Sequence, residues 1–519
     1  MGLESGIQRK PKLRALATKF AQGLGNWLST KGEKSHGGHL SLSSAIRGDP
    51  IRSVRRRLAA LWASALQPSR VYLGLGLSFG LLILAANPPA QAPDEGSHFF
   101  RAFQLSEGTL LGERDGARAG GQLPAVIVTT SDTGNIAFHA ENKMTWAFYR
   151  AKTDHLLVNW WAGPRRGFFP FANTVVAPPT SYLPQTLALA LGRALGLGPL
   201  PLLYLARLFA FGASLALGYA ALRCCPVYRW SMLMILLSPM SLYLTGSVAP
   251  DGVLVGAAFL LLALLLRLMA EPDRALRTGE KWALVLLAGL FSISKFVYCP
   301  LALLVLIFVW PRLDSVSAKL RFLLGGLVLC VIPGLLWSRA IVAIYVPFRT
   351  DVPLDPVAQF AYIQHAPGAF LGLMFRTIGA QWDFYYRWMV GVLGWGDTAL
   401  PAWFYSFFGC ALLGCVAVES GEAKVISGKQ RLLFLGSALA GILLIFVAQY
   451  AAWNPPRSHA LIEGIEGRYF LPLMPLLVLA FPQLPQLKGR RGLGIAATLA
   501  AGVGAGVCLW AVVNRYYLA

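Results

Sequence analysis

Long runs of apolar residues, separated by short charged segments, make up most of the chain from about residue 70 onwards. A helix that crosses a hydrocarbon core of about 30 Å needs roughly twenty residues that are mostly apolar. The pattern predicts eleven such helices, at 70–87, 200–222, 230–249, 251–269, 281–295, 297–311, 320–343, 401–418, 432–452, 469–484 and 492–513. The two short runs that meet at Lys295 are also compatible with a broken or re-entrant hairpin.

The charges between these runs predict how the chain is oriented. Cytoplasmic loops of membrane proteins are enriched in Lys and Arg. A cytoplasmic N-terminus satisfies this rule at every basic loop, namely those around 223–229, 267–281, 312–321, 424–431 and 488–491, and it puts the C-terminus outside. Two long segments, 88–199 and 344–400, then lie on the outer side of the membrane.

Two further apolar stretches are interrupted by polar residues, and we expect them to lie along the membrane. The stretch 181–197 contains Pro184, Gln185 and Arg193, and counting it as a span would invert every loop. The stretch 368–393 carries charged residues among aromatic ones, which suit the headgroup level. The predicted fold class is therefore an all-α polytopic membrane protein of about eleven transmembrane helices, with a large first outer loop that carries in-plane helices.

Composition agrees with this class. Of the 519 residues, 56% are hydrophobic and only 13% are charged, and the mean hydropathy is +0.55. Residues 1–70 hold thirteen Lys or Arg and three acidic residues, which accounts for ten of the 22 net positive charges. We therefore divide the chain into a basic cytoplasmic tail over 1–69, with amphipathic helices near 13–28 and 51–66, and a membrane domain over 70–515. The tail suits an anionic membrane surface, and no nucleic-acid-binding motif accompanies its charge.

A polar segment follows the first apolar run directly and contains the first candidate chemistry. Pro93 suits the start of a helix and Gly108 its end, so Asp94, His98 and Arg101 fall on one stripe of that helix. Ionisable residues next to a membrane are costly unless they are paired or hydrated, so a convergent set indicates a site. The residues that the topology places near the outer surface are Asp94, Glu95, His98, Arg101, Asp251, Lys295, Asp397 and Arg468.

Each of these residues also has a purely structural interpretation. Asp94, Glu95 and Asp251 stand where acidic residues complement the N-termini of helices. Lys295 could extend its amine to the membrane surface, and Arg468 could pair with Glu466. The sequence has no GxxxxGK[ST] phosphate loop, HExxH helix, GxSxG elbow or DxD pair. Any energy for a reaction should therefore arrive in a membrane-borne donor.

Several short motifs resemble a bacterial multi-pass membrane family of unknown function that is grouped with the GT-C glycosyltransferases. The signature PDExxHFxRAxQxSEG follows the first span, with Gly96 where the family usually has Pro. The other matching segments are 181–185 (SYLPQ), 247–251, 294–298 (SKFVY), 394–398 (GWGDT) and 467–472 (GRYFLP), and Glu466 stands where the family usually has Gln. These segments occur in the order expected for the family, and the resemblance spans roughly residues 70 to 515.

The resemblance implies a glycosyltransferase at the outer face of the bacterial cytoplasmic membrane. Its donor would be a polyprenyl-phosphate-linked sugar, and its acceptor a glycan, a lipid or a protein. Asp94 would be the catalytic base and Glu95 an auxiliary acid or metal ligand, because such enzymes neutralise the leaving phosphate with basic residues or a divalent cation. Lys295 and Arg468 would contact the donor phosphate, with His98, Arg101, Asp251 and Asp397 as further substrate-binding candidates.

Two other classes of function remain compatible with the sequence. A transporter or flippase for a lipid-linked glycan or an anionic solute would use charges at several depths of the membrane, and Arg207 and Arg339 do lie within or near predicted spans. A non-catalytic membrane partner of a glycan-assembly complex would keep the fold without needing the acidic residues.

Overall fold

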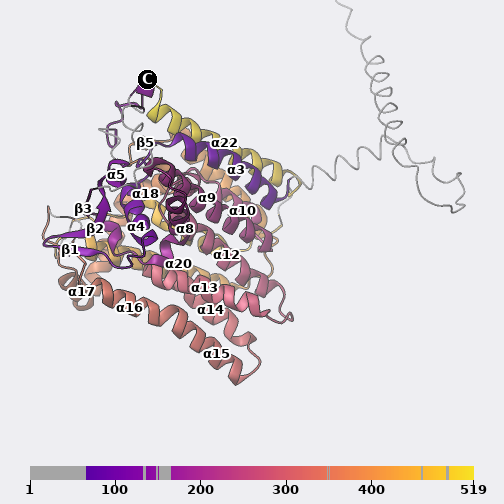
Figure 1. Cartoon of the computed structure of the whole chain (residues 1–519). Helices are drawn as coiled ribbons and strands as arrows, with labels where there is room; N and C mark the ends of the chain where they lie inside the picture. Colours follow the sequence, from indigo (N-terminus) through magenta and orange to yellow (C-terminus); the bar gives the residue numbers. More distant parts are fainter. Residues whose placement is uncertain are drawn as a thin grey trace, which may run out of the picture. The chain divides into compact units, whose positions relative to one another are not determined.

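The computed structural model describes residues 66–519 apart from 132–135, 148–149, 151–164, 348, 350, 457–459, 487–489 and 519. The described residues belong to one structural unit, which consists mainly of helices (Figure 1). The amphipathic helices predicted in the N-terminal tail lie outside the described residues, except for the last residue of the second one.

Seven helices in the described part of the chain are long and apolar enough to cross a membrane. They are α3 (Pro68–Ala86), α9 (Pro199–Cys224), α12 (Asp251–Ala270), the continuous helix Val316–Ile341, α19 (Ala402–Ser420), α20 (Gly428–Trp453) and α22 (Arg490–Tyr516). The helix Val316–Ile341 comprises α15 (Val316–Gly326), the π-helical turn η5 (Leu327–Val331) and α16 (Ile332–Ile341). Each of the seven coincides with a predicted span. A multi-pass membrane protein is therefore confirmed, whereas the count of eleven spans is not.

Two of the remaining predicted spans are broken helices. The run 230–249 divides into α10 (Arg229–Leu236) and α11 (Pro239–Thr245). Pro239 has no N–H with which to continue the hydrogen bonds of α10, and the Ser238 hydroxyl accepts the Ser241 N–H at the start of α11. The run 469–484 contains the 3-10 helix η6 (Gly467–Leu473) and the short α21 (Met474–Ala480). Apolar composition alone does not reveal such breaks.

The two short runs around Lys295 form a helical hairpin. Helix α13 (Thr278–Ser294) is followed by η3 (Phe296–Tyr298), α14 (Cys299–Val309) and η4 (Trp310–Arg312). The Arg312 guanidinium donates hydrogen bonds of 2.6 to 3.2 Å to three carbonyl oxygens of residues 268–272, at the end of α12. The hairpin therefore starts and ends near the C-terminus of α12. Its tip, which contains Lys295, lies near the N-terminus of α12.

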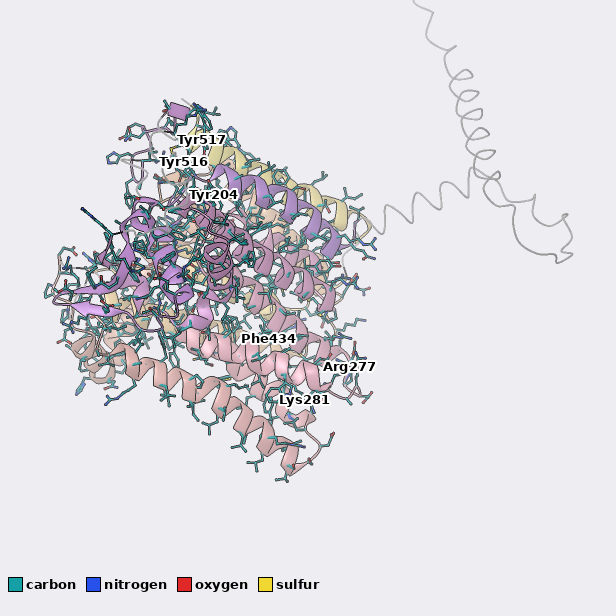
Figure 2. All side chains as sticks on the ribbon, in the orientation of Figure 1. Tyr204, Arg277, Lys281, Phe434, Tyr516 and Tyr517 are labelled. Atoms are coloured by element: carbon teal, nitrogen blue, oxygen red, sulfur yellow. The ribbon has the colours of Figure 1, made fainter. Side chains whose placement is uncertain are left out.

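The two ends of the described unit can be followed in the figures. The strands and α5 (Ala125–Thr129) lie at one end in Figure 1, and Figure 2 labels Tyr516 and Tyr517 near that end. We call it the sheet end. Arg277 and Lys281 are labelled at the opposite end. The connections from α12 to α13 and from α14 to α15 also lie there.

The segment between α3 and α9 contains strands, so the prediction of an all-α fold is wrong here. After α4 (Glu95–Ser106), strands β1 (Glu113–Asp115), β2 (Arg118–Pro124) and β3 (Arg166–Pro170) form an antiparallel sheet in the order β1-β2-β3. Gly120 lies so close to Phe169 of β3 that a side chain there would meet its carbonyl group. The strands are short, and β2 contains Gly and Pro, which are depleted in strands, so the residue pattern does not indicate them.

The predicted in-plane segments are helices. After α7 (Ala172–Val175) and η2 (Pro179–Tyr182), the stretch 181–197 forms α8 (Leu183–Ala194), on which Leu183, Leu187 and Leu191 share one exposed face. The stretch 368–393 forms α18 (Pro367–Gly391), which follows α17 (Pro356–His365). A two-stranded sheet of β4 (Val392–Leu393) and β5 (Thr398–Ala399) comes next. Where these helices lie relative to a membrane stays a prediction.

Helix α12 is the most buried of the seven long helices. Of its most apolar window, 72% is buried inside the protein, a larger share than in any of the other six. It packs against α9 and α11, where Gly256 allows close approach to the α9 backbone at Ser214 and Gly252 to the α11 backbone at Thr245. Because α12 is enclosed in this way, Asp251 at its first position is fixed relative to the neighbouring helices.

Candidate functional site

Asp94 stands at the N-cap of α4 but does not cap it. Its backbone is left-handed, with φ 58° and ψ 10°, a conformation that Asp tolerates better than most residues. Its side chain makes no capping hydrogen bond. Instead, one carboxylate oxygen accepts from Asn173 Nδ2 at 3.0 Å and the other from Arg468 Nη2 at 3.2 Å. The carboxylate therefore faces α7 and η6 rather than its own helix.

Arg468 lies against Asp94 from a segment almost 400 residues away in the sequence. Its side chain is only 4% exposed, and its Nε lies 2.7 Å from a carboxylate oxygen of Glu466. Gly467 lets η6 press against the backbone of α18 at Tyr385 and Met389, which fixes the position of Arg468. Within the described residues, the buried Nη1 atom of Arg468 has no hydrogen-bond partner. The guanidinium thus keeps a donor that no described protein atom uses.

A second ion pair lies beside the first. Lys295 Nζ and Asp251 Oδ1 are 2.6 Å apart, joining the break after α13 to the first residue of α12. The Tyr469 ring connects the two pairs, because Lys295 Nζ lies 5.6 Å from its centroid and the Arg468 guanidinium carbon 5.5 Å. Cations within about 6 Å of a ring centroid are attracted to it. The three carboxylates of Asp94, Asp251 and Glu466 and two cations therefore meet at the sheet end.

His98 lies within electrostatic reach of both pairs, one turn along α4 from Asp94. Its Nδ1 is 2.6 Å from the Tyr182 hydroxyl. Burial lowers the pKa of His98 to about 4, helped by the cations Lys295 and Arg468 and opposed by the carboxylates of Asp94 and Asp251. Burial also raises the pKa of Tyr182 well above its usual range. At neutral pH this pair is therefore uncharged.

The structure places Glu95 apart from this cluster. Its side chain is fully buried against Arg207 of α9, with Nε to Oε1 at 2.7 Å and Nη2 to Oε2 at 2.6 Å. The same carboxylate accepts the Val248 N–H at 3.1 Å. Both of its oxygens are thus occupied, so Glu95 does not suit the predicted part of an auxiliary acid or metal ligand. It holds the start of α4 against α9.

Two other candidate residues also have structural partners outside the cluster. The buried Arg101 donates to the carbonyl oxygens of Ala177 and Leu110 and to the Gln104 side chain. Asp397 accepts from Arg515 near the end of α22, at 2.7 Å and 3.2 Å. The Arg101 hydrogen bonds hold the segments that follow α4 and α7 against α4. The Asp397 contact joins α22 to the loop between β4 and β5. Neither side chain contacts Asp94 or Lys295.

The sequence did not single out several residues that complete the cluster. Asn173 and Tyr182 are neutral, so the pattern of charged residues near the membrane does not indicate them. Tyr182 does lie in the motif SYLPQ, which resembles the family pattern, and Tyr469 lies in GRYFLP. Glu466 was considered only as an alternative partner of Arg468. Burial raises the pKa of Glu466, and the Arg468 charge opposes that effect.

The described carboxylates do not fit a metal centre of their own. Over the part of the chain that the structure describes, no group of three or more His, Cys, Asp or Glu side chains is arranged to hold a metal ion. Asp94 and Glu95, the suggested ligands, point to different partners. The cations of the described cluster are the side chains of Arg468 and Lys295.

Comparison with known proteins gives one match. No curated protein and no solved structure matches the chain. The model of the family described as predicted membrane protein (DUF2142) matches residues 77–477, which include the whole cluster around Asp94 and Arg468. Because this match spans well over half of the 519 residues, the chain belongs to the DUF2142 family of predicted membrane proteins.

Proposed function

We propose that the protein is an integral-membrane glycosyltransferase of the GT-C type. It transfers a sugar from a polyprenyl-phosphate donor to a hydroxyl group of a glycan, lipid or protein at the outer face of the bacterial cytoplasmic membrane. The motifs around Asp94 and Arg468 that resemble the GT-C-like family support this reaction. The loop charges described above support the orientation, because they place the Asp94 end of the helices outside.

One observation carries the proposal. The partly exposed carboxylate of Asp94 lies 3.2 Å from a buried guanidinium whose Nη1 has no hydrogen-bond partner among the described residues. A buried donor without a partner is costly, so its presence favours a ligand that accepts hydrogen bonds. A phosphate oxygen matches the charge and the fork geometry of Arg468. A base and a phosphate-binding group thus stand next to each other.

In the proposed reaction, the acceptor hydroxyl gives its proton to the Asp94 carboxylate as its oxygen attacks the anomeric carbon. The bond from that carbon to the phosphate oxygen breaks, and its electron pair leaves with the lipid phosphate. Arg468 and Lys295 stabilise the negative charge that develops on the leaving group. Asp251 holds Lys295 in place at 2.6 Å. Asn173 orients the base through its 3.0 Å hydrogen bond.

The structure weakens one argument for transport as the alternative. A transporter would use charges within the depth of the membrane, and the two candidates within or near predicted spans are Arg207 and Arg339. Arg207 is fully buried with Glu95 and also donates to three backbone carbonyl oxygens, so it has a structural explanation. A cluster at one end of the helices suits surface chemistry better.

The test is transfer from a polyprenyl-phosphate-linked sugar by the purified full chain. Asp94→Asn keeps the size of the side chain and removes the base, and loss of a general base typically lowers the rate about 10²- to 10⁴-fold. Asp351→Asn is the matched control, because Asp351 is 64% exposed and its ion pair among the described residues is with Arg349. Transfer at the normal rate by a folded Asp94→Asn protein would exclude Asp94 as the base. No transfer from any of a panel of polyprenyl donors would count against the enzyme itself.

A further inference from the structure

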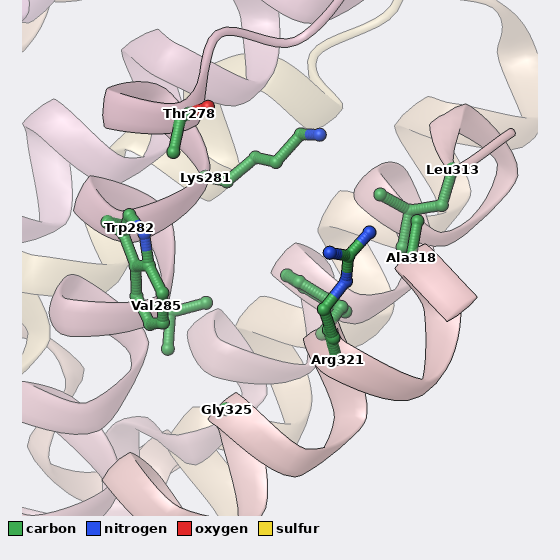
Figure 3. A pocket seen from close by; sticks show the side chains of 9 residues that line it. Thr278, Lys281, Trp282, Val285, Leu313, Ala318, Arg321 and Gly325 are labelled. Atoms are coloured by element: carbon green, nitrogen blue, oxygen red, sulfur yellow. The ribbon is translucent and has the colours of Figure 1, made fainter. Parts of the chain in front are cut away.

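A cavity of about 280 Å³ lies far from the Asp94 cluster, between α13 and α15 (Figure 3). Lys281 in the first turn of α13 lines it, whereas Lys295 directly follows the last turn of the same helix. At 1.5 Å per residue, the backbone positions of these two lysines are about 21 Å apart along the helix. The cavity is therefore near the opposite end of α13, which the loop charges place on the cytoplasmic side.

Two cations face this cavity without a carboxylate partner. Figure 3 shows the Lys281 amine and the Arg321 guanidinium extending from α13 and α15 toward the same opening. Neither side chain has an ion pair or a hydrogen bond with the described residues, and none of the lining residues is acidic. Glu280, the nearest acid in the sequence, instead accepts from Arg274 at 2.8 Å and from the Arg277 N–H. Arg267 and Arg274, at the same end, form ion pairs with Glu271 and Glu280, whereas Lys281 and Arg321 have no such pair among the described residues.

The rest of the lining is mainly apolar and lies where the protein surface is apolar. Trp282 and Val285 line one wall and Phe322 the other, and Trp282 is 50% exposed. Only 6% of the most apolar window of the helix Val316–Ile341 is buried inside the protein. An uncovered apolar helix of this length belongs in the bilayer. The cavity thus combines two cations with walls next to lipid chains.

We infer that this cavity binds an anionic phospholipid. Its phosphate lies between the Lys281 amine and the Arg321 guanidinium, and an acyl chain runs along Trp282 and Phe322. A phosphate between two neighbouring cations relieves their mutual repulsion and gives each a charge-assisted hydrogen bond. Basic pockets between membrane helices on the cytoplasmic side suit lipid headgroups for this reason. A free phosphate would use the cations but not the apolar walls.

Lipid binding by the purified full chain tests this inference without any transfer assay. Native mass spectrometry would count phosphatidylglycerol molecules retained per chain, with phosphatidylcholine as the neutral comparison. The variant is Lys281→Gln/Arg321→Gln, and the control is Lys319→Gln. Lys319 is on the same helix as Arg321, but its amine lies 5.5 Å from the Trp310 ring centroid and it does not line the cavity.

Wild-type protein should prefer phosphatidylglycerol. The double variant should bind it about thirty-fold more weakly, at roughly tenfold per 1.4 kcal/mol and about 1 kcal/mol per cation. The Lys319→Gln protein should bind like the wild type. Thermal melting of each variant shows whether it is folded. Equal binding by the folded double variant, or no preference for the anionic lipid, would overturn the inference. Displacement of the lipid by millimolar inorganic phosphate would overturn the assignment to a lipid.

Discussion

Asp94 and Glu95 are adjacent acids, but the structure predicts opposite outcomes when each is changed to its amide. Glu95 and Arg207 are both 0% exposed, and Arg207 donates five hydrogen bonds, two of them to Glu95. Glu95→Gln leaves the Arg207 charge buried and turns one acceptor into a donor that faces it. Breaking a buried pair in this way costs about 3–5 kcal/mol. A carboxylate as exposed as Asp94, at 32%, should contribute about 1 kcal/mol or less.

The free energy of unfolding, measured by denaturant titration in mixed detergent micelles, separates these cases. Glu95→Gln should lower it strongly and Asp94→Asn only slightly. The double variant Glu95→Gln/Arg207→Gln removes both charges, so it should lose less than the sum of the two single changes. If Glu95→Gln were as stable as the wild type, or if the double variant lost the full sum, the pair would not anchor α4.

Two further predictions concern residues around the cluster. Because the folded-state pKa of His98 is about 4, against a usual value of 6.5, its contribution to stability is complete above about pH 6.5 and is lost as the pH falls toward 4. In melting curves recorded from pH 7 to 4, His98→Gln should therefore lose less stability at low pH than the wild type does. His365→Gln is the control, because His365 is exposed. A wild-type pH dependence in the His98→Gln protein would contradict this prediction. Gly467→Ala would place a methyl group against the backbone of α18, so it should cost about 1–3 kcal/mol of stability and lower transfer. Gly436→Ala, with open space around it, is the control, and equal melting temperatures for the two would refute this packing argument.

The apolar pattern predicted the long helices well, since seven of the eleven predicted spans are continuous helices of at least eighteen residues. The apolar pattern did not reveal where a helix is interrupted, because an interruption depends on the backbone. The apolar run 230–249 is broken at Pro239 and the run 469–484 by the 3-10 helix η6, although the side chains on both sides of each break are mostly apolar. The strands β1 to β3 were missed because pairing of short, glycine-containing segments is decided by contacts between distant residues.

The candidate cluster was predictable in its location but not in its pairing. Loop charges placed Asp94, Asp251, Lys295 and Arg468 near one membrane surface, and the structure brings all four together. No sequence pattern could indicate that Glu95 selects Arg207 in another helix, because that choice depends on how α4 lies against α9. Without a known partner, Arg207 resembles the intramembrane charge of a transporter. With Glu95 beside it, Arg207 is a structural residue.

The order of the two acids explains how a single helix start can provide both a buried anchor and a partly exposed carboxylate. Successive residues of a helix point about 100° apart, so Glu95, the first residue of α4, reaches α9 while its neighbour cannot. The left-handed backbone of Asp94 keeps that residue outside the helix and turns its carboxylate toward Asn173 and Arg468. A carboxylate that reacts must be held by groups that do not themselves react. The buried pair of Glu95 and Arg207 fixes α4, and it therefore fixes Asp94 opposite Arg468, whose Nη1 atom has no hydrogen-bond partner in the described part of the chain.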